Sequence, residues 1–151
     1  MDMNGLVLLL LMVLMLSCSL GRPANLGVTH GKLLPCPDSL NCVSSQSPDR
    51  RHFIDPFRYE GEQQLARDRL VAAIQGMKRS KVVTVRDDYI HAEFTSAFFR
   101  FVDDVEFYFD SDEKTIHMRS ASRIGYSDFG VNRKRLEEIR SMLKGPPMRN
   151  G

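Results

Sequence analysis

The fold is decided by the stretch Val105-Glu-Phe-Tyr-Phe-Asp-Ser-Asp-Glu-Lys-Thr-Ile-His-Met-Arg-Ser-Ala121, which contains two alternating runs joined by a polar turn. Phe107 and Phe109 in the first run match Ile116 and Met118 in the second. Alternation of apolar and polar residues is typical of a strand with one buried face, and a short polar link favours an antiparallel hairpin. The stretch therefore predicts two adjacent strands that share one apolar and one polar face.

Two more strands are predicted upstream, at residues 81–85 and 89–95, with Asp87-Asp88 as the turn between them. Apolar residues recur at helical spacing over residues 62–79 and again after Gly130, where the second helix ends near Gly145-Pro146. The sequence therefore predicts an α+β fold: a helix, a four-stranded antiparallel meander and a second helix, with both helices on the apolar sheet face. The polar face then carries Tyr89, His91, Glu93, Glu106, Tyr108, His117 and Arg119.

The composition is that of an ordinary globular domain and excludes some classes of partner. Of the 151 residues, 42% are hydrophobic and 26% charged, and the formal net charge is +2. Because no long basic run is interleaved with aromatic residues, we expect no nucleic-acid partner. The motifs of nucleophile elbows, phosphate-binding loops and zinc proteases are missing from the sequence, so no cofactor is expected.

The N-terminus has the features of an export signal. Residues 6–16 form an unbroken apolar run, and Met15-Leu-Ser-Cys18 at its end resembles the lipobox of bacterial lipoproteins. We predict a lipoprotein-type signal peptide at 1–17, lipid on Cys18, a flexible tether at 18–35, one domain at 36–145 and a disordered tail at 146–151. The expected location is the periplasm or cell envelope, at a membrane. The bulky Leu16 and the lack of Lys or Arg at residues 1–4 leave an uncleaved anchor or a plain signal peptide as alternatives.

The two remaining cysteines, Cys36 and Cys42, lie in a turn-prone stretch rich in Pro, Asp, Ser and Asn. In an exported protein this spacing favours a disulfide that closes a small loop. A zinc site or a reactive thiol are the alternatives, but a zinc site requires a second ligand pair, which the sequence lacks.

A second stretch, Arg119-Ser-Ala-Ser-Arg-Ile-Gly-Tyr-Ser-Asp-Phe-Gly-Val-Asn-Arg-Lys-Arg135, concentrates basic, amide and hydroxyl groups between the last strand and the last helix. Three basic residues open that helix, although the helix dipole favours acidic residues there. An anion bound nearby would remove this conflict, so the motif predicts a site for an anionic small molecule or an envelope protein. The predicted ligand-binding residues are Arg119, Arg123, Asp128, Asn132, Arg133 and Arg135. In the alternative interpretation, Asp128 or Asn132 caps the helix and the arginines form internal salt bridges.

Asp103 also breaks a local rule, because alternation places its carboxylate on the apolar face. Either a bulge at 102–104 turns it outward, which we favour, or it pairs with Arg100, Arg119 or Arg123. If the protein is an enzyme, Asp103 or Asp104 would be the general base of a hydrolase for an anionic envelope ester. His91 and His117 share the polar face with Glu93 and Glu106, but surface histidines are commoner than metal ligands, so no metal is expected.

Three motifs in order carry a family resemblance: Leu34-Pro-Cys-Pro-Asp-Ser-Leu-Asn-Cys-Val-Ser-Ser45, Phe101-Val-Asp-Asp104 and the stretch from Arg119 to Arg135. Over about residues 34–144 the chain resembles the family catalogued as domain of unknown function 1499. The resemblance implies a small exported, lipid-anchored or membrane-associated protein with that family's fold. It implies no activity, so a binding protein, a hydrolase and a purely structural envelope domain all remain hypotheses, and an enzyme is the less favoured class.

Overall fold

The computed structural model describes residues 22–144. The predicted signal peptide, the lipidation site Cys18 and the tail at 146–151 lie outside these residues. None of the helices among these residues has the length and hydropathy that a membrane-spanning segment requires. The elements are β1 (Cys42–Ser44), β2 (Phe57–Arg58), α2 (Gln63–Gln75), β3 (Ser80–Val85), β4 (Tyr89–Thr95), β5 (Val102–Asp110), β6 (Thr115–Ser122) and α3 (Val131–Lys144).

The α+β class is confirmed, and β3 to β6 form the predicted antiparallel meander in the order β6-β5-β4-β3. The predicted count of four strands is wrong, because β1 and β2 both pair with the free edge of β6 and make the sheet six-stranded. These two strands contain three and two residues. Such short segments are too brief to show an alternating pattern, so the sequence did not reveal them.

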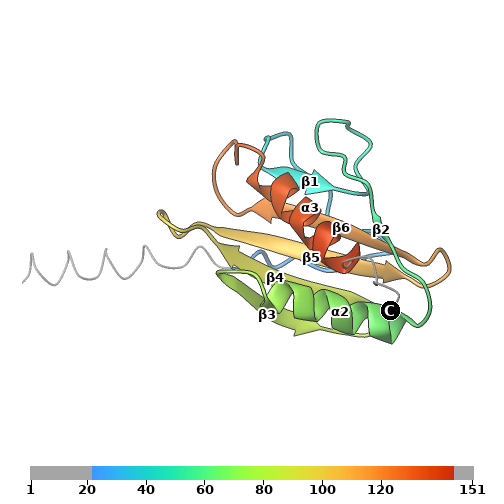
Figure 1. Cartoon of the computed structure of the whole chain (residues 1–151). Coiled ribbons are helices and arrows are strands. Elements are labelled where there is room, and N and C mark those ends of the chain that lie inside the picture. Colours follow the sequence, from blue (N-terminus) through green and yellow to red (C-terminus); the bar gives the residue numbers. More distant parts are fainter. Residues whose placement is uncertain (1–21, 145–151) are drawn as a thin grey trace, which may run out of the picture.

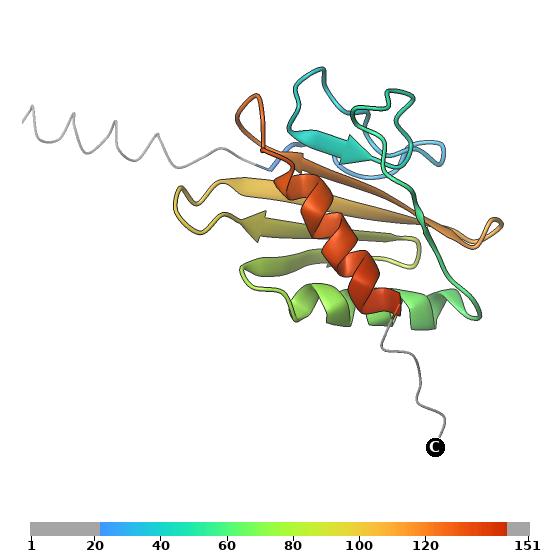
Figure 2. The same ribbon diagram turned by 45° about the horizontal axis from the view of Figure 1, so that its top comes forward.

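Both helices cover one face of the sheet, as predicted (Figure 2). Leu70 and Ile74 of α2 and Leu136 and Ile139 of α3 are fully buried against this face. Burial of one such side chain contributes about 1.5–3 kcal/mol. The sheet side of this core consists of Val43, Phe57, Ile90, Ala92, Phe94, Val105, Phe107, Phe109, Ile116 and Met118.

The helix α2 ends earlier than the apolar spacing predicted. The structure places its last residue at Gln75, and the Ser80 hydroxyl donates to the carbonyl oxygens of Ile74 and Met77 at 2.7 and 2.9 Å. These bonds satisfy carbonyl groups that a continuing helix would have bonded. The chain therefore turns into β3 over residues 76–79.

The opposite, polar face of the sheet is covered by residues 22–33, which run behind it in Figure 1. The Gly27 amide donates to Glu106 Oε1 at 2.8 Å, and Leu33 is only 4% exposed. Residues 22–33, which belong to the predicted tether, therefore make specific contacts with the sheet. As a result His91 is buried, not on a solvated surface as the sequence suggested.

Candidate functional site

Asp103 lies on the helix-covered face of β5 and pairs with Arg135 of α3. The β5 ladder is regular there, since Asp103 is opposite Phe94 on one side and Ser122 on the other. The preferred prediction of a bulge is therefore wrong. The alternative of a buried ion pair is correct, but its partner is none of the three arginines named. Arg135 Nη2 donates to Asp103 Oδ2 at 2.6 Å, across 32 residues of sequence.

Arg135 also binds two polar side chains near the start of α3, those of Asn132 and Ser120. Its Nη1 donates to Asn132 Oδ1 at 2.7 Å and to Ser120 Oγ at 3.0 Å. Its guanidinium lies over the Phe94 ring, 4.7 Å from the centroid. Asn132 is fully buried and donates to the Asn41 carbonyl oxygen at 3.1 Å. Its Oδ1 also accepts the Ser120 hydroxyl at 2.5 Å. This predicted ligand residue therefore links α3 to β6 and to the residue that precedes β1.

Asp128 caps α3 and supplies the anion that the helix start requires. Its Oδ2 accepts the Asn132 amide at 2.8 Å, and its Oδ1 accepts the Gly130 amide at 2.9 Å. The Lys134 amide is already bonded to the Gly130 carbonyl oxygen. The conflict with the helix dipole is thus removed internally, as the capping alternative proposed.

On the other face of the sheet, Arg123 joins two acids from adjacent strands. Its Nε and Nη2 donate to the two Asp104 oxygens at 2.8 Å each, and Nη2 also donates to Glu93 at 2.7 Å. His91 Nε2 lies 2.8 Å from Asp104 Oδ1, and Arg22 adds a second cation to Glu93 at 3.0 Å. Burial alone would raise the pKa of Asp104, but the bonds from Arg123 and His91 outweigh it and lower the pKa to about 2.

Glu106 is the fully buried centre of a second network on this face. Its carboxylate accepts the Tyr89 hydroxyl at 2.8 Å, the Gly27 amide at 2.8 Å and Arg119 Nη1 at 3.3 Å. The pKa of Tyr89 is raised, first by burial and then by the Glu106 carboxylate, so the phenol acts as the donor. The predicted ligand residue Arg119 is therefore 6% exposed and paired with an internal acid.

Arg133 makes exposed contacts with the backbone of residues 51–53, which precede β2. Its two terminal nitrogens donate to the carbonyl oxygens of Phe53 at 2.7 Å and Arg51 at 3.2 Å. With this residue, all six predicted ligand residues have partners within the domain. These contacts favour the alternative interpretation, in which the arginines tie the loop and the helix to the sheet.

Among residues 22–144, two groups of side chains have the geometry of a metal site. His91, Glu93 and Asp104 place one ligand atom each within 4.8 Å of one another, and so do Asp110, Glu113 and His117 near the β5–β6 turn. The first group does not suit an ion, because Arg123 already donates to both of its carboxylates. In the second group burial lowers the pKa of His117, but Glu113 is exposed in the turn.

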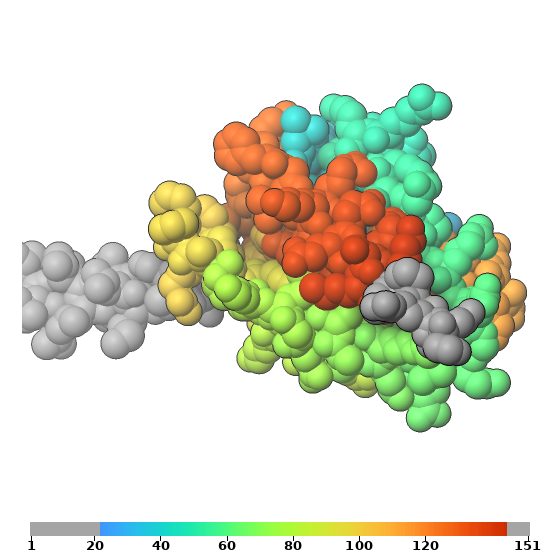
Figure 3. Space-filling model, viewed as in Figure 1, coloured from blue at the N-terminus to red at the C-terminus, as the bar shows by residue number. Residues whose placement is uncertain are grey.

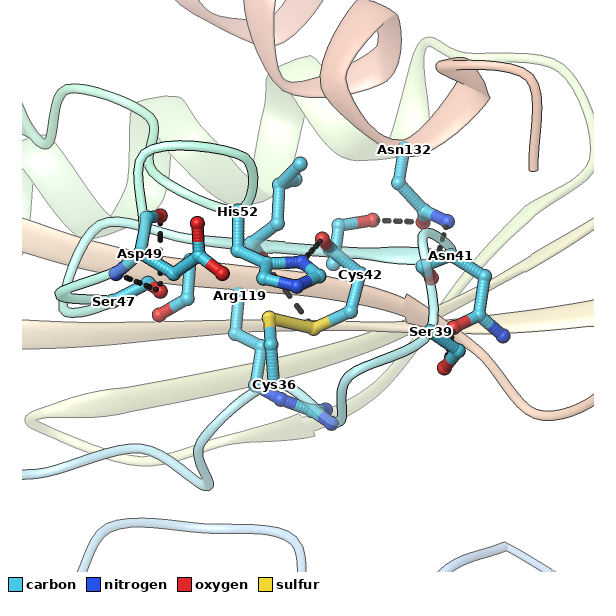
Figure 4. Close-up of a disulfide and its surroundings, with 12 residues drawn as sticks. Cys36, Ser39, Asn41, Cys42, Ser47, Asp49, His52, Arg119 and Asn132 are labelled. Carbon is cyan, nitrogen blue, oxygen red and sulfur yellow. Dashed lines mark hydrogen bonds between the residues drawn. A yellow bond between two sulfur atoms is a disulfide. The ribbon is translucent and has the colours of Figure 1, made fainter. Parts of the chain in front are cut away.

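The predicted disulfide between Cys36 and Cys42 is confirmed, with 5.6 Å between the Cα atoms. Figure 4 shows the His52 ring and the Arg119 side chain beside it. His52 Nδ1 lies 2.9 Å from the Cys42 carbonyl oxygen, and Cys42 pairs with Ala121 across the sheet. The bond therefore fixes residues 36–42 to the β6 edge.

The model of the family described as protein of unknown function (DUF1499) matches residues 32–143. The chain belongs to this family. The matched residues include the disulfide and every acid–arginine pair described above except the one made by Arg22. Arg22 and Gly27, which cover the polar face, precede the family match. A search of curated proteins finds none with significant similarity to the chain.

Within the family domain, a groove of about 410 Å³ lies between the α2–β3 turn, the end of β4 and the start of α3. Lys78 and Arg79 line it from the turn, and Lys134 and Arg135 from the helix, against the acids Asp103 and Glu138. Of the six predicted ligand residues, Arg135 alone lines this groove. No sequence pattern singles out Lys78 and Arg79, because basic residues at the end of a helix are expected from the helix dipole alone.

Proposed function

We propose that the protein is an exported, lipid-anchored envelope protein that binds an anionic ligand and catalyses no reaction. The observation that carries the binding proposal is the excess of basic side chains in the groove, four against two acidic ones. The confirmed disulfide supports export, because disulfides persist outside the reducing cytosol. The apolar run and Cys18 support the lipid anchor.

Three of the basic groups in the groove are available to a ligand. Lys78, Arg79 and Lys134 are exposed, and none of them belongs to an ion pair among residues 22–144. The Arg135 guanidinium, stacked on the Phe94 ring, gives the groove a partly apolar lining as well. A volume of about 410 Å³ suits a small molecule with an anionic group such as a phosphate or sulfate ester.

The basic residues that we propose for ligand binding therefore lie mainly in the α2–β3 turn, and not in the predicted motif at residues 119–135. Arg119, Arg123 and Arg135 are each bound to a buried carboxylate, which reduces their capacity to attract a second anion. Lys78 and Arg79 have no such acid, so they dominate the recognition that we propose.

The binding test compares the wild type with a Lys78→Ala/Arg79→Ala/Lys134→Ala variant by calorimetric titration with inorganic phosphate and glycerol phosphate. Because a hydrogen bond to a charged group contributes about 1.5–3 kcal/mol, we expect affinity at least about tenfold weaker in the variant. Arg50→Ala is the control for loss of a surface cation, since Arg50 is exposed and does not line the groove. Equal affinity in the wild type and the triple variant would remove the proposal.

A hydrolase is the second candidate, because Asp103 lines the same groove. Asp104 is a poor general base, since its pKa of about 2 leaves it weakly basic at neutral pH. Asp103 is held by Arg135, but it faces the groove. Hydrolysis of a phosphate ester that disappears in Asp103→Asn would establish the enzyme and contradict the non-catalytic proposal.

The location is tested separately by mass spectrometry of the mature N-terminus. A diacylglyceryl group on Cys18 as the first residue supports the lipid anchor. An intact Met1, or cleavage elsewhere without lipid, contradicts it.

A further inference from the structure

Two aromatic loops lie side by side at one end of the sheet. Antiparallel pairing places Thr95 opposite Val102 and Asp103 opposite Ser122, so the loops at 96–101 and 123–130 leave the sheet at the same end (Figure 1). Together they expose five aromatic side chains. These are Phe98 at 92%, Phe99 at 77%, Phe101 at 45%, Tyr126 at 70% and Phe129 at 96% exposure.

These side chains project from the domain instead of packing on it. In Figure 3 the yellow 96–101 segment stands out from the body, with the orange loop above it. The rings of Phe99 and Phe101 stack on each other at 5.4 Å. A cluster of phenylalanines exposed to this degree is unusual in a soluble domain and marks an interaction surface.

The backbone holds the aromatic residues in this position. Arg100 and Phe129 adopt φ angles of 54° and 53°, in the left-handed region that side chains other than glycine rarely adopt. The base of the first loop is closed by the Ser96 amide bonded to the Phe101 carbonyl oxygen at 2.8 Å. The Phe101 amide donates to Ser96 Oγ at 2.9 Å. The loop is therefore a closed, defined structure.

The described chain begins at this same end. Arg22 Nη2 lies 3.0 Å from Glu93 Oε1, and Glu93 lies near the end of β4 beside the aromatic loops. Residues 1–21, with their apolar run at 6–16, consequently join the domain here. With the lipid on Cys18 that we propose above, or with an uncleaved anchor, the point of membrane attachment would precede Arg22 and so lie at this end.

We propose that this end of the domain docks on an anionic lipid bilayer, with the aromatic tips of the two loops inserted among the headgroups. Arg100, exposed between Phe99 and Phe101, faces the phosphates of that surface. The basic groove borders the same end, since Ser96 and Ala97 form part of its lining. The docking does not depend on the identity of the ligand in the groove.

The test uses tryptophan, which the chain lacks. Phe99→Trp and Phe129→Trp introduce a reporter into each loop, and Val85→Trp is the control, because Val85 is 47% exposed at the opposite end of β3. Each full-length variant is added to vesicles of phosphatidylglycerol and phosphatidylcholine with brominated acyl chains. Both loop reporters should shift to shorter emission wavelength and be quenched by the bromolipid, while the control keeps its solvent-exposed emission.

Removal of the aromatic residues supplies the second arm. In a Phe98→Ser/Phe99→Ser variant that also carries Phe129→Trp, quenching should fall at least about twofold, because burial of a phenylalanine contributes a large part of such insertion. Quenching of the loop reporters no greater than that of Val85→Trp overturns the proposal. A blue shift that grows with protein concentration without vesicles also overturns it, because the partner is then a second copy of the chain. If the protein floats with the vesicles but the loop reporters are not quenched, the result supports the membrane anchor and rejects only the docking of the loops.

Discussion

Arg135 in α3 donates to the carboxylate of Asp103 in β5 at 2.6 Å, so a buried ion pair joins the last helix to the central strand of the sheet. Asp103 is 7% exposed. Removal of one partner from such a pair leaves the other charge buried without a counterion, which is strongly unfavourable. The pair therefore determines how α3 sits on the sheet more than it adds to the net free energy of unfolding.

The Arg135→Ala variant should lower the free energy of unfolding by about 3–5 kcal/mol, because Asp103 remains as an unpaired buried carboxylate. Urea unfolding followed by circular dichroism measures the change. Lys134→Ala is the control and should change stability by less than about 0.5 kcal/mol, since Lys134 is exposed. An Asp103→Asn/Arg135→Met variant should recover part of the loss. A fully stable Arg135→Ala protein would show that the pair is not formed in solution.

Asp104 should impose a pH dependence on stability. Its pKa falls from 3.8 to about 2 in the folded protein, so the stabilisation is present above pH 4 and is lost as the pH falls towards 2. The difference corresponds to about 2 kcal/mol. Carbon-13 NMR titration of the side-chain carboxyl measures the pKa directly. Arg123→Ala should move the midpoint upwards, and a wild-type midpoint near 3.8 would contradict the contacts described.

Glu106 should hold the N-terminal segment on the sheet. Glu106→Gln removes the negative charge that pairs with Arg119 and that strengthens the bond from the Gly27 amide, so stability should fall by about 3 kcal/mol. Hydrogen exchange at the Gly27 amide should accelerate about fivefold, since a bond to a charged acceptor contributes about 1.5–3 kcal/mol and a bond to the neutral Gln oxygen about 0.5–1.5 kcal/mol. Tyr89→Phe removes one donor to the same carboxylate and is the milder comparison, with a loss of about 1 kcal/mol. Unchanged protection of Gly27 in Glu106→Gln would refute the role of the carboxylate.

The disulfide should stabilise the domain by restricting the unfolded chain. The bond joins residues six positions apart, and a loop of this size contributes about 2–3 kcal/mol in the chain-entropy model. Cys36→Ser/Cys42→Ser should lose this amount in urea unfolding, and reduction of the wild type should reproduce the loss. Addition of a reductant to the double serine variant is the control and should have no effect. Complete unfolding of the double variant would mean that the bond is required for more than loop closure.

Local patterns of the sequence determined a large part of this fold. The alternation around Phe107 and Ile116 predicted the central hairpin and its buried face, and the spacing of Leu136 and Ile139 predicted the helix that covers it. The cysteine spacing predicted the disulfide. These features were predictable because each depends on residues that are close along the chain, where the periods of strand and helix act directly.

Tertiary structure alone decided how the polar groups are paired. The sequence showed that Asp103 needs a partner, but Arg135 reaches it only because α3 folds back over β5. In the same way, Gly27 meets Glu106 across 79 residues and turns a face predicted to be solvated into an interior. Hydrogen bonds and ion pairs act over a few ångströms in space, whereas sequence patterns carry information over a few residues along the chain. The network that connects the arginines therefore became visible only when the sheet, its two helices and the N-terminal segment were assembled.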